Sequence, residues 1–280
     1  MKSWEFDYVR TIVGEDSGMV LDKGKEYIVE SKLLAFCRRE SIDSIGDLIA
    51  ALRRKDARLR DRLVDHMTNN ETLFFRDGGV FEALASELLP NMMEARKQER
   101  ALNIWSAASS SGQEIYSIAI SIREHLPELR HWRLRLIASD ISTEMLERCR
   151  QGVYSKLELG RGMPANLMRR YFDAEGDSFR VKKELRDMVE LKQINLSRPW
   201  PQLPKMDVIF LRNVLIYFDV ETKRDILGRA RRLLADDGYL TLGGGETTLN
   251  IDDQFERARL GRSIYYRKKG APAQPLDKAG

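Results

Sequence analysis

From residue 100 onward, short apolar segments alternate with segments whose apolar residues recur every three or four positions. The apolar segments lie at 101–107, 133–140, 206–213 and 238–245. The helical pattern lies between them, at 111–126, 141–154 and 221–238, and the last helix is predicted to end at Gly238. Strands that alternate with helices favour a mostly parallel sheet with helices on both faces. The sequence therefore predicts an α/β fold with a doubly wound, Rossmann-like sheet.

Periodicity and turn residues divide the 280 residues into parts. We expect an N-terminal helical domain over residues 1–90 and a main domain over 91–269. Within the main domain, short alternating segments around the turn sequence EGD predict a small β-hairpin insertion at about 165–190. Two further strands are predicted, one at 187–196 and an edge strand at 262–269. Residues 270–280 are expected to form a disordered tail.

Overall composition excludes several classes of protein. The chain is 42% hydrophobic and 32% charged, which suits a packed core and argues against broad disorder. Cys37 and Cys149 lie far apart with no metal-like spacing, so reduced thiols and no metal are expected. No secretory signal is visible, and no apolar run approaches the roughly 18 residues that a membrane helix needs. We therefore expect a cytoplasmic protein that does not insert into a membrane.

Residues 42–67 combine helical apolar spacing with a face rich in arginine. The arginines of interest are Arg53, Arg54, Arg58 and Arg60. Aspartates are interleaved with them, so one interpretation is a solvated face of mixed charge. The alternative is a docking surface for an acidic partner, which fits a net charge of +4 and a pI near 9.0.

Polar residues follow the first three strands, where a doubly wound sheet binds its ligands. The first strand leads into SAASSSGQE, whose small residues let a ligand approach the backbone. Only Gly112 is present there, so the dinucleotide fingerprint fails and a ligand without phosphates is favoured. Asp140 ends the second strand, where it could accept hydrogen bonds from both hydroxyls of a ribose or interact with a helix N-terminus. Arg212 and Asn213 end the third strand. An adenosyl cofactor such as S-adenosylmethionine fits this pattern, with a nicotinamide cofactor as the alternative.

The stretch TNNETLFFRD at 68–77 sets amides and charged groups beside two phenylalanine rings. On a helix surface the rings would face water, and in a core the polar groups would all need partners. A wall that is apolar on one side and hydrogen-bonding on the other suits a small-molecule pocket.

Four segments together resemble the chemotaxis receptor glutamate methyltransferase (CheR) family. They are TNNETLFFRD, WSAASSSGQEIYSIAI, ASDISTEMLERCRQGVY and DVIFLRNVLIYFD. They stand in the family's order, and the resemblance runs from about residue 10 to 269. It implies a Rossmann-like methyltransferase domain that transfers a methyl group from S-adenosylmethionine to glutamate side chains of chemoreceptor helices. The products would be glutamate methyl esters and S-adenosylhomocysteine.

The resemblance also implies roles for individual residues. Asn70 and Thr72 would contact the cofactor, and Arg76 would lie close to its methyl group. Glu114 would meet the methionine amino group, and Asp140 would bind the ribose.

Further roles follow from the later segments. Asn195 and Leu196 would lie against the adenine, and Arg212 and Asn213 near the substrate opening. Tyr217 would sit beside the reacting centre, with Arg76 as the second catalytic residue. The acidic helices of chemoreceptors would be the partner of the arginine-rich face, and a monomer is expected.

Methyl transfer to a carboxylate needs no general base, since free glutamate, with a pKa of about 4.3, is ionised at neutral pH. His66, His125 and His131 are accordingly expected to be structural or surface residues. Two other hypotheses stay open at this point. One is a nucleic-acid methyltransferase of the same fold, although no motif for a flipped base is present. The other is a non-catalytic adaptor that binds the cofactor.

Overall fold

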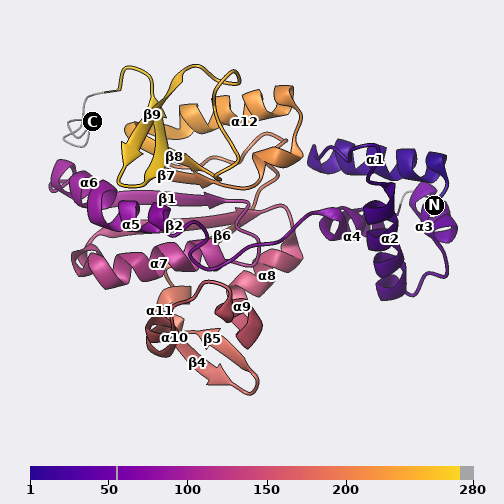
Figure 1. The fold of residues 1–280 in the computed structure, drawn as a ribbon, viewed down its shortest axis with the longest axis horizontal. Helices are drawn as coiled ribbons and strands as arrows, with labels where there is room; N and C mark the ends of the chain where they lie inside the picture. The colour runs from indigo at the N-terminus through magenta and orange to yellow at the C-terminus, as the bar shows by residue number, and fades with distance from the viewer. Residues whose placement is uncertain (55, 272–280) are drawn as a thin grey trace.

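The computed structural model describes residues 1–54 and 56–271. The rest of the predicted tail, from residue 272, lies outside the described residues. Figure 1 shows a large sheet with helices above and below it, a group of N-terminal helices at one end and a small second sheet beneath. Within the described ranges, no helix is long and apolar enough to cross a membrane.

The large sheet has seven strands in the order β6-β2-β1-β7-β8-β10-β9. Their bounds are β1 Ala101–Ala107, β2 Arg133–Asp140, β6 Val189–Gln193, β7 Met206–Leu211, β8 Leu234–Leu242, β9 Phe255–Leu260 and β10 Ser263–Lys268. The five strands from β6 to β8 pair in parallel, whereas β10 pairs antiparallel with both β8 and β9. The prediction of a mostly parallel, Rossmann-like sheet is confirmed.

Alternate residues of the central strands enter two separate cores. Trp105 and Ile209 face α12 (Val220–Leu233), while Ile104 and Phe210 face the opposite side of the sheet. That opposite side is covered by α5 Gly79–Ala83, the short π-helix Leu84–Leu88, α6 Leu89–Ala95 and α7 Gln113–His125. Helices on both faces explain why these strands are almost continuously apolar.

Two expectations about the C-terminal region are wrong. The helix predicted to end at Gly238 ends at Leu233, because Leu234 already pairs with Met206 and is fully buried as the first residue of β8. The strand at 262–269 exists as β10 but is not the edge of the sheet. The edge is β9, in which two consecutive charged residues, Glu256 and Arg257, interrupt the alternation that would indicate a strand.

The N-terminal helices are α1 Ser3–Ser17, α2 Glu26–Glu40, α3 Ile45–Arg53 and α4 Ala57–Met67. The arginine-rich segment is thus two helices rather than one. Ser44 caps α3 by accepting from the backbone N–H of Asp47, and Asp56 caps α4 by accepting from that of Leu59. Beyond residue 68 the chain leaves this group, and α5 and α6 pack on the sheet instead.

The predicted hairpin is present and belongs to a three-stranded sheet in the order β3-β5-β4. These strands are β3 Val153–Ser155, β4 Phe172–Glu175 and β5 Ser178–Val181, with α9 Lys156–Gly160, α10 Ala165–Tyr171 and α11 Lys183–Arg186 around them. Phe74 packs edge-on against Tyr154 and Phe172, at centroid distances of 5.0 and 5.7 Å. The small sheet therefore holds the 68–77 segment against the main domain.

Candidate active site

A pocket lies at the carboxyl ends of the parallel strands, between the main domain and the N-terminal helices. All the residues that the sequence assigned to the cofactor or the reacting centre line it. They are Asn70, Thr72, Arg76, Glu114, Asp140, Asn195, Leu196, Arg212, Asn213 and Tyr217. Residues far apart in the sequence thus meet in one cavity, as expected for a ligand site of a doubly wound fold.

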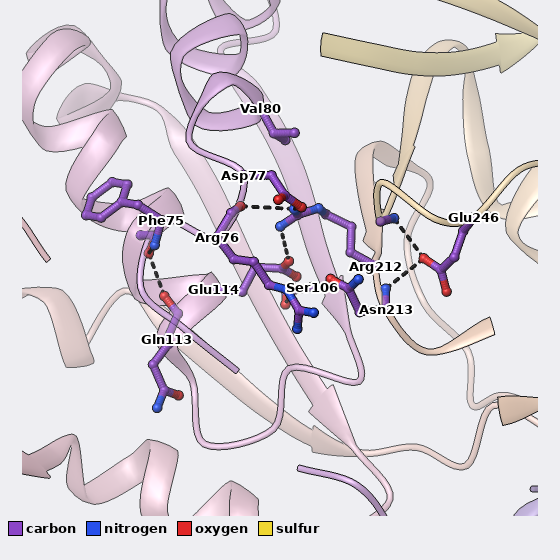
Figure 2. Close-up of polar contacts among 12 residues, drawn as sticks. Phe75, Arg76, Asp77, Val80, Ser106, Gln113, Glu114, Arg212, Asn213 and Glu246 are labelled. Carbon is purple, nitrogen blue, oxygen red and sulfur yellow. Dashed lines mark hydrogen bonds and ion pairs between the residues drawn. The ribbon is translucent and has the colours of Figure 1, made fainter. Parts of the chain in front are cut away.

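Arg212 is the most highly connected polar residue of the site. Its side chain is 1% exposed and contacts Glu114 Oε2 at 3.0 Å and Asp77 Oδ2 at 2.6 Å. It also donates to the carbonyl oxygen of Arg76 at 2.9 Å and lies over the ring of Phe81. Figure 2 shows the guanidinium between Glu114, Asp77 and the Arg76 carbonyl oxygen. Arg212, which is part of the pocket lining, therefore sets the position of Glu114 and of the chain at 76–77.

Glu114 is held from both sides. Its Oε1 accepts from the hydroxyl of Ser106 at 2.8 Å, and its Oε2 pairs with Arg212. The side chain belongs to the first turn of α7 and reaches the pocket. A fixed, poorly solvated carboxylate at this place can bind an ammonium group of a ligand.

Asp140 is buried at the end of β2 and organises two loops. Its Oδ2 accepts from the N–H of Ser110 at 2.8 Å, and its Oδ1 accepts from the N–H of Ser142 at 2.9 Å. Burial raises the pKa of Asp140, and these backbone N–H groups oppose that shift. Each oxygen keeps a further lone pair for a ligand hydroxyl. Asp140 therefore fixes the loop before α8 (Thr143–Gln151) and also lines the pocket, where its contact with a ribose stays a prediction.

The small-residue loop after β1 packs closely against α8. Gly112, at φ +97°, lies against α8, and a β-carbon there would come within 2.4 Å of Cys149 Sγ. Only glycine fits this position. The loop also contacts the 68–77 segment, because Ser110 Oγ donates a hydrogen bond to the carbonyl oxygen of Asn70 at 2.8 Å.

The 68–77 segment crosses the pocket as a mixed wall. Phe74 is buried, whereas Phe75 is only partly buried, and its N–H donates to Ser117 Oγ at 2.9 Å. Phe75 and Asp77 have φ of 51° and 57°, so the segment is held in a conformation that such residues seldom adopt. This tight turn presents Arg76 to the pocket.

Tyr217 and Asn195 connect the main domain to the N-terminal residues. Tyr217 Oη accepts from Asn69 Nδ2 at 2.7 Å. Asn195 Nδ2 donates to the carbonyl oxygen of Asp16 at 2.6 Å, at the end of α1. Sequence reasoning missed Ser17 and Met19, which also line the pocket, because no local pattern marks them.

Sequence reasoning also missed Glu246, which lies just beyond the glycine run that follows β8. Its carboxylate accepts from the backbone N–H groups of Asn213 and Gly243, both at 2.7 Å, as Figure 2 shows. An acidic residue directly after a strand and a glycine run was a visible indication of this role.

The four arginines of the basic segment are not equivalent. Arg60 pairs with Glu15 and Asp16 at the end of α1. Arg53 lies over the rings of Trp4 and Tyr8, at 5.1 and 5.3 Å. Arg54 and Arg58 are exposed.

The histidines and cysteines lie away from the pocket. His66 contacts the carbonyl oxygen of Lys32, His125 and His131 are exposed, and both cysteines are buried free thiols. Across residues 1–54 and 56–271, no cluster of histidine, cysteine, aspartate or glutamate could hold a metal ion.

Comparison with known proteins gives matches along nearly the whole chain. The profile of the CheR methyltransferase all-alpha domain matches residues 4–68, and that of the CheR methyltransferase SAM binding domain matches residues 70–264. Chemotaxis protein methyltransferase 1 of Pseudomonas aeruginosa is 39% identical over 270 residues, covering 95% of this chain and 98% of that protein. The chemotaxis protein methyltransferase of Vibrio parahaemolyticus is 41% identical over 257 residues, covering 90% of this chain and 92% of that protein.

Proposed function

The chain belongs to the CheR methyltransferase family, and from this premise we propose that it methylates glutamate side chains of chemoreceptor cytoplasmic helices. The methyl donor is S-adenosylmethionine, and the products are glutamate methyl esters and S-adenosylhomocysteine. The names of the curated relatives, chemotaxis protein methyltransferases, support this substrate class.

The observation that carries the proposal is the pair of poorly solvated carboxylates in one pocket. Asp140 ends β2, and Glu114 lies in the first turn of α7, the helix that follows the neighbouring strand β1. Each is already oriented by hydrogen bonds from the protein. Glu114 would bind the methionine ammonium and Asp140 the ribose hydroxyls. Asn195 and Leu196 would contact the adenine ring.

S-adenosylmethionine, when bound, supplies an electrophilic methyl group on a sulfonium. The receptor glutamate is already an anion, so the protein has to orient it and exclude water. Arg76 and Tyr217 line the same pocket as the two carboxylates and are proposed to hold the glutamate oxygens. Positioning of this kind contributes up to about 7–11 kcal/mol in favourable cases. A site with little water also favours the reaction, because opposite charges cancel as the bond forms.

A transfer assay tests the function directly. The protein is incubated with S-adenosylmethionine labelled in its methyl group and with a chemoreceptor cytoplasmic fragment. Label released from the receptor by mild alkali, and located on glutamate by peptide mapping, is the expected result. Label on RNA, or no transfer to any receptor fragment, would contradict the proposal.

Asp140→Ala is expected to weaken binding of S-adenosylmethionine at least tenfold, or about 1.4 kcal/mol. The substitution removes the ribose contact and leaves the N–H groups of Ser110 and Ser142 without their acceptor. Calorimetric titration of both proteins measures the change, with S-adenosylhomocysteine as a second ligand. Equal affinities would mean that Asp140 only braces its loops.

Reversal of Arg54 and Arg58 to glutamate is expected to raise the KM for receptor by about tenfold and to leave cofactor affinity unchanged. The two side chains are exposed, so their attraction for an acidic helix is long-range and screened by salt. Steady-state kinetics at low and high ionic strength measure this effect. Arg60→Glu is the contrasting variant, because Arg60 pairs with the end of α1 beside the pocket. If the double variant lost cofactor binding instead, this surface would support the pocket rather than dock the receptor.

A further inference from the structure

Glu246 joins three backbone N–H groups through one carboxylate. Oε2 accepts from Asn213 and Gly243, each at 2.7 Å, and Oε1 accepts from Ile216 at 3.3 Å. Two of these donors belong to residues 213–217, which follow β7, and the third follows β8. Glu246 thus ties the segment that carries Tyr217 to the end of the neighbouring strand. We call residues 213–217 the acceptor loop.

Local conformation alone does not place the acceptor loop. Asn213 has φ +58°, a left-handed conformation that asparagine tolerates better than most residues with a side chain do. The loop also carries an exposed apolar residue, Ile216, with 54% of its surface in water. Apolar packing holds the neighbouring Leu215, which is buried in the core, so the hydrogen bonds of Glu246 fix the residues on either side of it, Asn213 and Ile216.

The opposite side of the acceptor loop is held by N-terminal residues. The N–H of Val20 donates to the carbonyl oxygen of Tyr217 at 2.8 Å, and Asn69 Nδ2 donates to its hydroxyl at 2.7 Å. The phenol is therefore fixed only while the loop itself keeps its place between the two domains.

We propose that Glu246 is a positioning residue for methyl transfer, acting through the backbone of the acceptor loop on Asn213 and Tyr217. The inference rests on the proposed function, in which Tyr217 orients the receptor glutamate. Glu246 does not line the pocket that contains Glu114 and Asp140. Its loss should therefore disturb the methyl acceptor and spare the cofactor.

Three variants remove or disturb the anchor to different extents. Glu246→Ala deletes the acceptor, and Glu246→Gln keeps its size and one acceptor oxygen. Gly243→Ala leaves Glu246 in place but sets a β-carbon within 2.5 Å of Asn213 Nδ2 and 2.8 Å of Glu246 Oε2. The control is Gly244→Ala, since a β-carbon at Gly244 meets nothing within 4 Å.

Each variant is examined by hydrogen exchange, cofactor calorimetry and receptor kinetics. Glu246→Ala and Gly243→Ala are expected to lower kcat at least tenfold and to speed amide exchange at 213–217. Cofactor affinity should stay within about threefold of the wild-type value. Glu246→Gln is expected to fall between wild type and Glu246→Ala, and Gly244→Ala should match wild type.

Two outcomes would overturn the inference. One is unchanged exchange and kcat in Glu246→Ala. The other is a loss of cofactor affinity as large as the loss of kcat, which would make Glu246 a support of the cofactor pocket. A wild-type protein that methylates no receptor would contradict the proposed function instead. Exchange and calorimetry would still decide whether Glu246 anchors the loop without affecting the cofactor.

Discussion

Arg212→Ala is expected to lower the free energy of unfolding by about 3–5 kcal/mol, the range for removing one partner of a buried ion pair. The substitution leaves Glu114, whose side chain is 12% exposed, without its cation. It also removes the donor to the Arg76 carbonyl oxygen and the group that lies over Phe81. Chemical denaturation measures the stability change. Calorimetry should show at least a tenfold loss of S-adenosylmethionine affinity, because Glu114 is no longer fixed.

Asp77→Asn is the matched control for this substitution. Asp77 pairs with the same guanidinium, but its side chain is 55% exposed, so its charge is worth only about 0–1 kcal/mol. Asparagine also tolerates the left-handed conformation at that position. If Arg212→Ala destabilised the protein no more than Asp77→Asn does, the assignment of Arg212 as the organising residue would be wrong.

Arg76→Ala is expected to reduce kcat by about 100-fold or more, because a receptor carboxylate that is no longer held in line with the methyl group reacts far more slowly. The Arg76 side chain is half-buried and faces the pocket, where its Nη1 donates over a long distance, 3.4 Å, to the carbonyl oxygen of Glu71. Its charge is therefore available to a receptor carboxylate. Single-turnover measurements with saturating receptor separate this loss from weaker binding.

Tyr217→Phe is the comparison for Arg76→Ala. It removes one neutral hydroxyl, already bonded to Asn69, so the expected loss of kcat is less than about tenfold. Equal and negligible effects of the two substitutions would exclude both residues from the chemical step. Normal thermal unfolding of both variants is the necessary control.

Much of the fold could be predicted because buried parallel strands are almost continuously apolar segments of the sequence. The strand predicted at 133–140 is observed as Arg133–Asp140. The edge strand β9 escaped prediction because its consecutive charged residues, Glu256 and Arg257, interrupt the apolar alternation. Half-buried edge strands are recognised mainly by their neighbours, which a linear pattern does not show.

The residues of the candidate site also differ in whether the sequence could predict them. Asp140 and the loop around Gly112 could be identified from strand ends, since every doubly wound sheet places ligands there. Assignments such as Asn70 and Tyr217 depended on the family resemblance. Ser17 and Met19 were not predictable at all, because they reach the pocket only when the N-terminal helices dock.

The pocket walls come from two parts of the chain that are far apart in sequence and share one apolar core, with Ser17 and Met19 on one side and Asp140 and Asn213 on the other. A ligand that touches both walls binds the docked arrangement, in which the walls meet, and not the unfolded chain. At a free concentration 100 times its Kd, such a ligand adds about 2.7 kcal/mol to the docked state. Heat resistance, protease resistance and cellular lifetime of the protein are therefore expected to rise and fall with the supply of methyl donor.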